Sequence, residues 1–289
     1  MVSFKPYGYR TGRSGLQFSK TMWLFKYLFT NLYRALQTDN GRRLLWLFFR
    51  YAGRPRHQTG EIPFGRYRFD VPDAFSFVWQ YKEIFADESY RFTTTSPTPV
   101  ILDCGANIGT SIVWFRQTYP TARIIAFEAE PAIGAVLTRN LQHNGVSGVD
   151  IVQKAVWTDN EGLDFGSGEA DAGSLFSETG RKRVPSVRLR DYLLRETRID
   201  MLKIDIEGAE TAVLLDCRDA LAHVQNMFIE FHAYIGHLQT LASVMQVLED
   251  AGFRYYIDSS QGRTKPLVNH RYRGNDQMDV QLNIFAYRP

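Results

Sequence analysis

The first residues whose types and spacing could do chemistry follow a short apolar run at 100–104. Asp103 lies near the end of this run, and Gly105 and Gly109 come next, before a segment with helical periodicity at 110–118. Glycines at a strand-to-helix turn let the backbone turn sharply and approach a ligand closely. The common dinucleotide fingerprint has a third glycine and presents helix N–H groups to a pyrophosphate. An acid here argues against that anion and suits a ligand with a cationic amine or sulfonium end.

A second acid stands at the spacing that a ribose requires. Glu128 ends the next apolar run, 19 residues after Gly109, and an acid at about this distance accepts hydrogen bonds from ribose hydroxyls. A solvated acid at a strand end is the alternative. Small side chains after the third run are expected to line an adenine. The predicted cofactor-binding residues are Asp103, Gly105, Ala106, Asn107, Gly109, Thr110, Ser111, Glu128, Ala129, Ala155, Val156 and Asp205.

Charged residues interrupt a later apolar run. Lys203, Asp205 and Glu207 alternate with isoleucines, so a strand would place all three on one side. Charges inside a buried strand are costly unless they are paired or used. A structural ion pair of Lys203 with a glutamate, with Glu207 capping the next helix, is the alternative to a functional role. Glu210 is expected on the first turn of that helix, where an acid suits the helix dipole.

These motifs resemble those of the Rossmann-like S-adenosylmethionine-dependent methyltransferases and, among them, the FkbM family. The match extends over about residues 84–287, and its segments are 127–131, 172–175, 187–193, 228–232 and, almost residue for residue, 199–210 (IDMLKIDIEGAE). The resemblance implies S-adenosylmethionine as cofactor, with Ser174 in a small-residue loop beside it. It also implies transfer of a methyl group to a hydroxyl oxygen, often of a sugar or a natural product. It implies nothing about residues 1–60.

Methylation of a hydroxyl requires a group that accepts the hydroxyl proton. His232 is the preferred base because an unperturbed imidazole titrates near neutral pH, and Asp205 or Glu230 is expected to orient it. A structural histidine is one alternative, and a divalent metal held by Asp205, Glu230 and His232 is a less favoured one. His237 is a weaker substitute. The predicted catalytic residues are His232, Asp205, Glu207, Lys203 and Glu230, and no metal ligand is assigned.

Three further segments are expected to frame the acceptor and the cofactor. The glycine-rich stretch 162–180 and the basic stretch 259–279 are interpreted as a lid and a rim around the acceptor, or as solvated loops. The helix around 81–90 is expected to close over the cofactor, as the resemblance implies. Glu83 and Tyr90 are weak site candidates on it.

The elements that position these residues follow from the periodicity. From residue 100 onward, short apolar runs alternate with helical periods, which predicts a Rossmann-like α/β fold with helices on both faces of the sheet. The sheet is expected to be mainly parallel and seven-stranded with an antiparallel edge, its strands at 100–104, 123–127, 149–154, 201–206, 226–231, 254–257 and 280–287. Helices are expected at 110–118, 131–144, from 209, and at 238–251.

The region before residue 98 predicts two smaller units. Residues 61–97 read as a hairpin at 61–71 and a helix at 73–92 with Asp73 as N-cap, together capping the cofactor site. Residues 1–60 read as a basic, aromatic helical extension with helices at 21–37 and 42–51, separated by a turn at 39–41. The methyltransferase domain is expected at 98–289.

Charge separates the N-terminal extension from the rest of the chain. The first 57 residues hold 11 of the 34 Lys and Arg and one of the 31 acids, a net charge of +10, whereas the remainder carries −7. Cationic aromatic helices pack as a cap or lie on an anionic membrane face. Two cysteines, no signal-peptide pattern and no span of about 20 apolar residues predict a cytoplasmic protein with this peripheral membrane contact as a second expectation.

Several function classes remain to be weighed against one another. A hydroxyl of a sugar or glycan is the preferred acceptor, and a polyketide or other small molecule is the alternative. An RNA methyltransferase is disfavoured because the body is acidic and carries no recognised RNA-binding module, so nucleic acid is not expected as a partner. A nicotinamide-dependent dehydrogenase is disfavoured by Asp103, and a non-catalytic binding module is the last option. The oligomeric state and the identity of the acceptor do not follow from the sequence.

Overall fold

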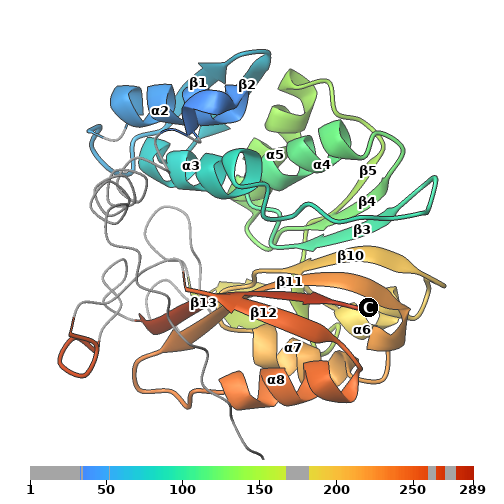
Figure 1. The fold of residues 1–289 in the computed structure, drawn as a ribbon. Coiled ribbons are helices and arrows are strands. Elements are labelled where there is room, and N and C mark those ends of the chain that lie inside the picture. Colours follow the sequence, from blue (N-terminus) through green and yellow to red (C-terminus); the bar gives the residue numbers. More distant parts are fainter. Residues whose placement is uncertain (1–32, 34, 52, 167–181, 260–264, 271–277) are drawn as a thin grey trace, which may run out of the picture.

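A single seven-stranded sheet organises the fold (Figure 1). The computed structural model describes residues 33, 35–51, 53–166, 182–259, 265–270 and 278–289. The strand order is β12-β13-β11-β10-β3-β4-β5. These strands are β3 (Val100–Cys104), β4 (Arg123–Phe127), β5 (Val149–Val152), β10 (Ile199–Ile204), β11 (Val224–Tyr234), β12 (Arg254–Asp258) and β13 (Met278–Tyr287).

The sheet has the predicted mixture of directions. The neighbours from β11 to β5 run parallel, whereas β13 pairs antiparallel with both β11 and β12. All six residues of the central strand β10 are buried, as expected for a parallel strand with both faces covered. The predicted Rossmann-like α/β fold with an antiparallel edge is therefore confirmed, and strand boundaries shift by a few residues.

Helices cover both faces of the sheet and enclose two cores (Figure 1). One face is covered by α4 (Thr110–Thr118) and α5 (Pro131–His143). The other face is covered by three helices and a short 3₁₀ turn, which are α6 (Leu189–Leu193), α7 (Glu210–Cys217), η2 (Leu221–His223) and α8 (Leu241–Asp250). Because parallel strands end on the same edge, the turns after β3, β4 and β10 meet there, which brings the sequence motifs together.

An N-terminal layer packs on the α4–α5 side of the sheet (Figure 1). It consists of α2 (Asp39–Tyr51), the hairpin of β1 (Gly60–Phe64) and β2 (Tyr67–Val71), α3 (Ala74–Tyr81) and the π-helical turn η1 (Lys82–Ala86). The predicted hairpin is confirmed, and so is the N-cap, because the Asp73 carboxylate accepts the Ser76 N–H at 3.0 Å. The helix expected to reach residue 92 ends at Ala86, and Glu88 takes a left-handed conformation with φ 53° just beyond it.

The turn expected at 39–41 is wrong, because these residues begin α2. The Thr38 hydroxyl oxygen accepts the Gly41 N–H at 3.0 Å and so caps the helix one residue earlier. Gly41 instead allows the backbone of α2 to pack closely against the backbone of Ala35, because a Cβ at Gly41 would lie 2.2 Å from the Ala35 carbonyl oxygen. Of the helix expected at 21–37, residues 33 and 35–37 are helical and most of the rest lies outside the described residues.

Short strands outside the main sheet were not predicted from the sequence. β6 (Ala155–Trp157) pairs parallel with β9 (Ser186–Arg188), and β7 (Leu163–Phe165) pairs antiparallel with β8 (Lys182–Val184). Three-residue strands are too short to show a period. Most of the predicted lid (167–181) and of the predicted basic rim (260–264 and 271–277) lies outside the described residues. No helix within the described part of the chain combines the length and the apolar character that crossing a bilayer requires.

Candidate active site

The loop between β3 and α4 is built for close backbone contact. Gly105 and Gly109 both have φ near +87°, a left-handed conformation that favours glycine. The N–H groups of Gly105 and Ala106 both donate to the Phe127 carbonyl, at 3.0 and 2.8 Å. A Cβ at Gly105 would lie 1.9 Å from the Asp205 carbonyl oxygen. The loop is therefore pressed against the end of β10, which joins the two most informative motifs of the sequence.

This packing predicts the effect of Gly105→Ala. The added methyl group collides with backbone rather than with a movable side chain, so the end of β10 must shift, and we expect a loss of cofactor affinity of at least about tenfold. Gly145→Ala is the matched control, because Gly145 also has a positive φ but has open space around its Cβ; it should cost only the backbone strain of about 1 kcal/mol. Calorimetric titration with S-adenosylmethionine and thermal melts compare the two, and equal effects would contradict the argument.

Asp103 does not face a ligand, contrary to the sequence expectation. Its side chain is completely buried. The Ser111 hydroxyl donates to its Oδ2 at 2.5 Å, and the Lys203 ammonium lies 3.2 Å from its Oδ1. A buried carboxylate on a central strand requires a cation beside it, and this one is the counter-ion of Lys203.

Lys203 ties three parts of the site together. Its ammonium donates to the Gly105 carbonyl at 2.8 Å and lies 3.3 Å from Asp205 Oδ2. Burial lowers the pKa of Lys203, but Asp103 and Asp205 outweigh it and hold that pKa above the usual range. The structural alternative predicted from the sequence was an ion pair of Lys203 with a glutamate. The partners are two aspartates instead, one on β3 and one beyond the end of β10.

Glu128 lies directly against the Gly105 loop. Its Oε2 accepts the Asn107 N–H at 2.9 Å and its Oε1 accepts the Glu130 N–H at 2.8 Å. Burial raises the pKa of Glu128 to about 7. Each carboxylate oxygen can accept a second hydrogen bond, so the ribose role stays a prediction with a suitable geometry.

The other predicted cofactor residues fall into three groups. Two hydroxyls already have intramolecular partners, since Thr110 donates to Gln80 at 2.9 Å and Ser111 to Asp103. Ala155 and Val156 are buried on β6, which follows β5. Ser174 lies outside the described residues.

Glu128 leads to a pH prediction for cofactor binding. Ribose hydroxyls donate to the ionised carboxylate, so affinity should be full above the pKa of about 7 and fall as the pH drops below it. Glu130 raises this pKa and Lys203 lowers it. Calorimetry at about pH 6 and about pH 8 should show this change in the wild type and a weak, pH-independent affinity in Glu128→Gln. A wild-type affinity that is flat across this range would remove Glu128 from the ribose site.

A second group of side chains surrounds His232 of β11 and includes residues of the turn after β10. Its Nδ1 lies 3.0 Å from Glu210 Oε1, and its Nε2 lies 3.8 Å from Glu207 Oε2 and 4.0 Å from Glu230 Oε1. We call Asp205, Glu207, Glu210, Glu230 and His232 the acidic cluster. His237 does not belong to it, because it is exposed beyond the end of β11.

The carboxylate that orients His232 is Glu210, so the expectation of Asp205 or Glu230 in that role is wrong. Glu210 is buried on the first turn of α7 and also accepts the N–H of Gly208 at 3.0 Å. The sequence predicts only a favourable interaction of Glu210 with the dipole of its helix. Its place as the last acid of the 199–210 signature was the available signal, but sequence spacing could not show that it reaches across to β11.

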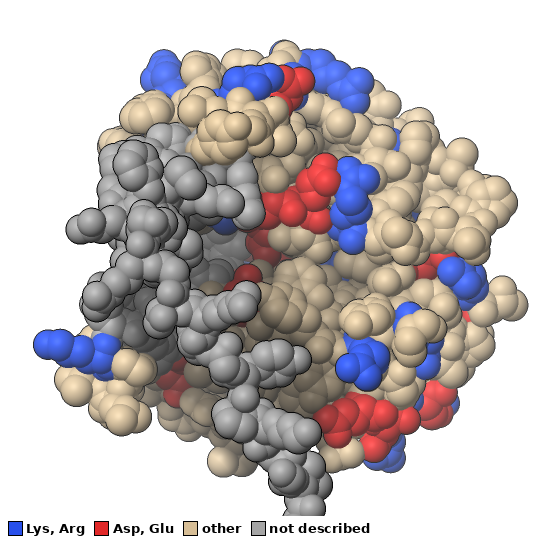
Figure 2. All heavy atoms as spheres, in the orientation of Figure 1, with Lys and Arg blue, Asp and Glu red and all other residues tan. Residues whose placement is uncertain are grey.

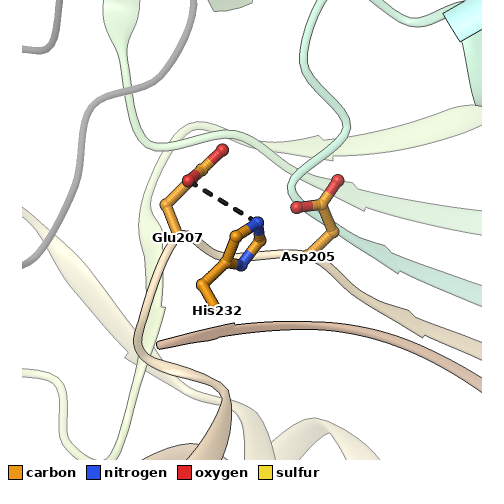
Figure 3. Close-up of side chains that lie close together, drawn as sticks. All are labelled: Asp205, Glu207 and His232. Carbon is orange, nitrogen blue, oxygen red and sulfur yellow. Dashed lines mark ion pairs between the residues drawn. The ribbon is translucent and has the colours of Figure 1, made fainter. Parts of the chain in front are cut away.

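Glu207 reaches His232 from a turn rather than from a strand. β10 ends at Ile204, so of the three residues expected to alternate on one strand, Lys203, Asp205 and Glu207, only Lys203 lies within it. Glu207 has φ 53°, and the Tyr234 hydroxyl donates to its Oε2 at 3.1 Å. Figure 3 shows Glu207 and Asp205 flanking the imidazole from the turn after β10.

The N-terminal layer completes this side of the site. Glu83 projects from η1 and accepts the Asn283 amide N–H at 2.7 Å. Burial and the nearby Asp205 raise the pKa of Glu83 to about 7. Tyr90 is buried, and its ring centre lies 5.9 Å from the Lys203 ammonium. Both weak candidates of the sequence analysis are thus placed beside the acidic cluster.

The acidic cluster is short of positive charge. Burial raises the pKa of Glu230 and of Glu207. Burial lowers the pKa of His232, but the carboxylates of Glu207 and Glu210 outweigh it and hold that pKa well above its usual range. Figure 2 shows acidic side chains gathered in a hollow of the surface between the N-terminal layer and the half that contains β10 to β13.

Comparison with known proteins gives this site its family. The model of the methyltransferase FkbM domain matches residues 103–255, which is just over half of the chain. The chain belongs to the FkbM methyltransferase family. This FkbM-family enzyme is an S-adenosylmethionine-dependent methyltransferase, as the sequence resemblance implied.

Individual relatives agree with this assignment. Methyltransferase sdnD from Sordaria araneosa is 32% identical over 220 residues, covering 63% of this chain and 83% of that protein. The 31-O-demethyl-FK506 methyltransferase FkbM from Streptomyces tacrolimicus is 26% identical over 211 residues, covering 60% and 80%. A solved structure of methyltransferase FkbM from Methylobacillus flagellatus KT aligns with a TM-score of 0.47 and 16% identity over 70% of this chain and 46% of that one.

The residues present fit the cofactor. Gly105 and the N-terminus of α4 are expected to approach its amino-acid part closely, while the Cβ side of Gly105 is already occupied by the Asp205 carbonyl oxygen. Asp205 is about a quarter exposed, whereas Asp103 is buried, so we expect Asp205 to contact a cationic amine. Glu128 remains the residue expected to accept hydrogen bonds from the ribose. When bound, S-adenosylmethionine supplies an electrophilic methyl group on a sulfonium.

Proposed function

We propose that this methyltransferase methylates a hydroxyl oxygen of a sugar or glycan. The supporting observation is the gap between His232 Nε2 and Glu207 Oε2, which are 3.8 Å apart. A hydroxyl oxygen that lies to one side of the line between these atoms can be within hydrogen-bond distance of both. A hydroxyl becomes an adequate nucleophile when its proton is accepted in the transition state, and the acidic cluster provides that acceptor.

The residues of the site divide the work as follows. Glu210 fixes the orientation of the His232 ring through the bond at Nδ1. His232 and Glu207 hold the acceptor hydroxyl, and its proton passes to the acidic cluster as the new C–O bond forms. Glu83, Asn283 and Gln281 add polar side chains beside this gap, which favours a polyhydroxyl acceptor over an apolar one.

The test is to identify the methylated product. Pools of nucleotide sugars, lipid-linked glycans, polyketide-type molecules and RNA are incubated with the enzyme and methyl-labelled S-adenosylmethionine, then separated and examined by mass spectrometry. We expect label in a carbohydrate fraction. Label confined to a polyketide-type scaffold would replace the proposed acceptor with the alternative. Label confined to RNA would overturn the proposal.

We also propose that residues 1–57 bring the enzyme to an anionic membrane face. The support is the net charge of +10 and the exposed aromatics of α2, where Trp46 is 48% and Phe49 86% exposed between arginines. Cations beside exposed aromatic rings suit an interfacial helix.

Flotation with vesicles containing phosphatidylserine tests the membrane proposal. We expect the full chain to float with these vesicles, and Trp46→Ser/Phe49→Ser to lose most of that binding. Tyr256→Ser is the matched control, because Tyr256 is 62% exposed on β12, outside the basic extension. Failure of the wild type to float, or equal flotation of all three proteins, would contradict this role for the extension.

A further inference from the structure

We infer that the acidic cluster is a binding site for a divalent cation of the Mg²⁺ or Mn²⁺ class. Asp205, Glu207 and His232 each offer one ligand atom, and these atoms all lie within 4.8 Å of one another. Two ligands of one ion lie up to about 4–5 Å apart, because each bond is about 2.0–2.6 Å long. Figure 3 shows the two carboxylates on either side of the imidazole.

The state of the imidazole points to a ligand independently of the acids. His232 is 5% exposed, and Glu210 occupies its Nδ1. The other ring nitrogen, Nε2, faces the gap between Glu207 and Glu230. Among the residues that the structure describes, no group lies within hydrogen-bond distance of Nε2; the nearest carboxylate oxygens are at 3.8 and 4.0 Å. A carboxylate on one ring nitrogen and an open second nitrogen is the arrangement found around metal-binding histidines.

The surrounding charge favours a cation. Lys203 is already engaged by Asp103 and Asp205, so it cannot neutralise the far side of the cluster. The carboxylates that surround Lys203 and His232 are those of Asp103, Asp205, Glu207, Glu210, Glu230 and Glu83. Two carboxylates and one imidazole with partly exposed oxygens suit Mg²⁺ or Mn²⁺ and leave positions open for ligands from solution.

The ion rests on the proposed function and changes one contact in it: an ion at Nε2 and Glu207 takes the position given above to the acceptor hydroxyl, which is then held by the ion. Bound at the cluster, it holds the acceptor oxygen and makes its proton more acidic. The O–H bond breaks with transfer of the proton to Glu230, the C–O bond to the methyl carbon forms, and the S–C bond breaks. Two open positions fit two neighbouring oxygens, so we infer an acceptor with vicinal hydroxyls.

Direct Mn²⁺ binding tests the site without any assay of activity. Chelator-treated protein is titrated with Mn²⁺ and followed by electron paramagnetic resonance. We expect saturable binding with hyperfine coupling to a histidine nitrogen in the wild type. Asp205→Asn, Glu207→Gln and His232→Ala should each weaken binding by about tenfold or more, and His232→Ala should lose the nitrogen coupling. Asp150→Asn, an exposed acid on β5, is the control and should bind as the wild type does.

Further measurements distinguish loss of the cation site from misfolding and from failure of the proposed function. Thermal melts identify any variant that fails to fold; cofactor titrations do so only for Glu207→Gln and His232→Ala, because Asp205 is itself expected to contact the cofactor. Glu210→Gln supplies a second readout, because loss of the orienting carboxylate should weaken Mn²⁺ binding about 10–100-fold. Absence of Mn²⁺ binding, or binding unchanged in all three ligand variants, would overturn the cation site. Methyl transfer that continues in chelator would then leave O-methylation standing without the ion.

Discussion

Replacing His232 by alanine is expected to lower the rate of methyl transfer by about 10²–10⁴-fold while leaving the affinity for S-adenosylmethionine unchanged. The reason is its position: His232 lies on β11 and contacts Glu210, whereas the residues expected to hold the cofactor are those of the Gly105 loop, Glu128 and Asp205. Single-turnover rates with labelled cofactor measure the first quantity, and calorimetry measures the second.

Two variants make this experiment interpretable. His232→Gln keeps a group that can donate to Glu210 and so protects the fold, but it should lose transfer nearly as completely. His223→Ala, in the short turn η2 before β11, changes a histidine with no motif support and should behave as the wild type does. Methyl transfer at the wild-type rate in His232→Ala would show that this residue takes no part in the chemistry. A loss of cofactor affinity as large as the loss of rate would show that His232 contributes to cofactor binding.

Replacing Lys203 by methionine is expected to cost about 3–5 kcal/mol in the free energy of unfolding, because it leaves Asp103 as an uncompensated buried charge. At about 2–4 °C per kcal/mol, the melting temperature should fall by on the order of 10 °C. The cofactor site should suffer as well, since the Lys203 ammonium also holds the Gly105 carbonyl at 2.8 Å.

The double variant Asp103→Asn/Lys203→Met distinguishes a charge effect from a packing effect. Removing both charges should restore a large part of the lost stability, since a buried pair can be replaced as a unit at little cost. Lys154→Met, at an exposed position after β5, is the control and should leave the melting temperature nearly unchanged. A double variant no more stable than Lys203→Met would show that shape, and not charge, sets the cost.

The strand-and-helix order of the sheet was predictable because apolar runs and helical periods are local properties of the sequence. The same holds for the Asp73 cap and for the glycine loop. What the sequence could not supply was the pairing of charges between elements. Asp103 and Lys203 are 100 residues apart in the chain, and only the register of β3 against β10 makes them neighbours.

The acidic cluster illustrates the same limit. Asp205, Glu207, Glu230 and His232 were all candidates, yet the carboxylate that contacts the ring is Glu210, which a helix on another layer brings across. Strand alternation failed at Glu207 because β10 ends three residues before it. Side-chain contacts beyond a strand end depend on turn geometry, which a period cannot predict.

The most direct test of the central claim is the NMR chemical shift of an isotope-labelled methyl carbon after transfer to a carbohydrate acceptor. If the acidic cluster deprotonates a hydroxyl, the labelled carbon appears as a methyl ether in the wild-type reaction, and that signal accumulates about 10²–10⁴-fold more slowly with His232→Ala. A labelled carbon bound to nitrogen, sulfur or carbon would contradict the proposed O-methylation. Formation of the methyl ether by His232→Ala at the wild-type rate would contradict the role of the acidic cluster.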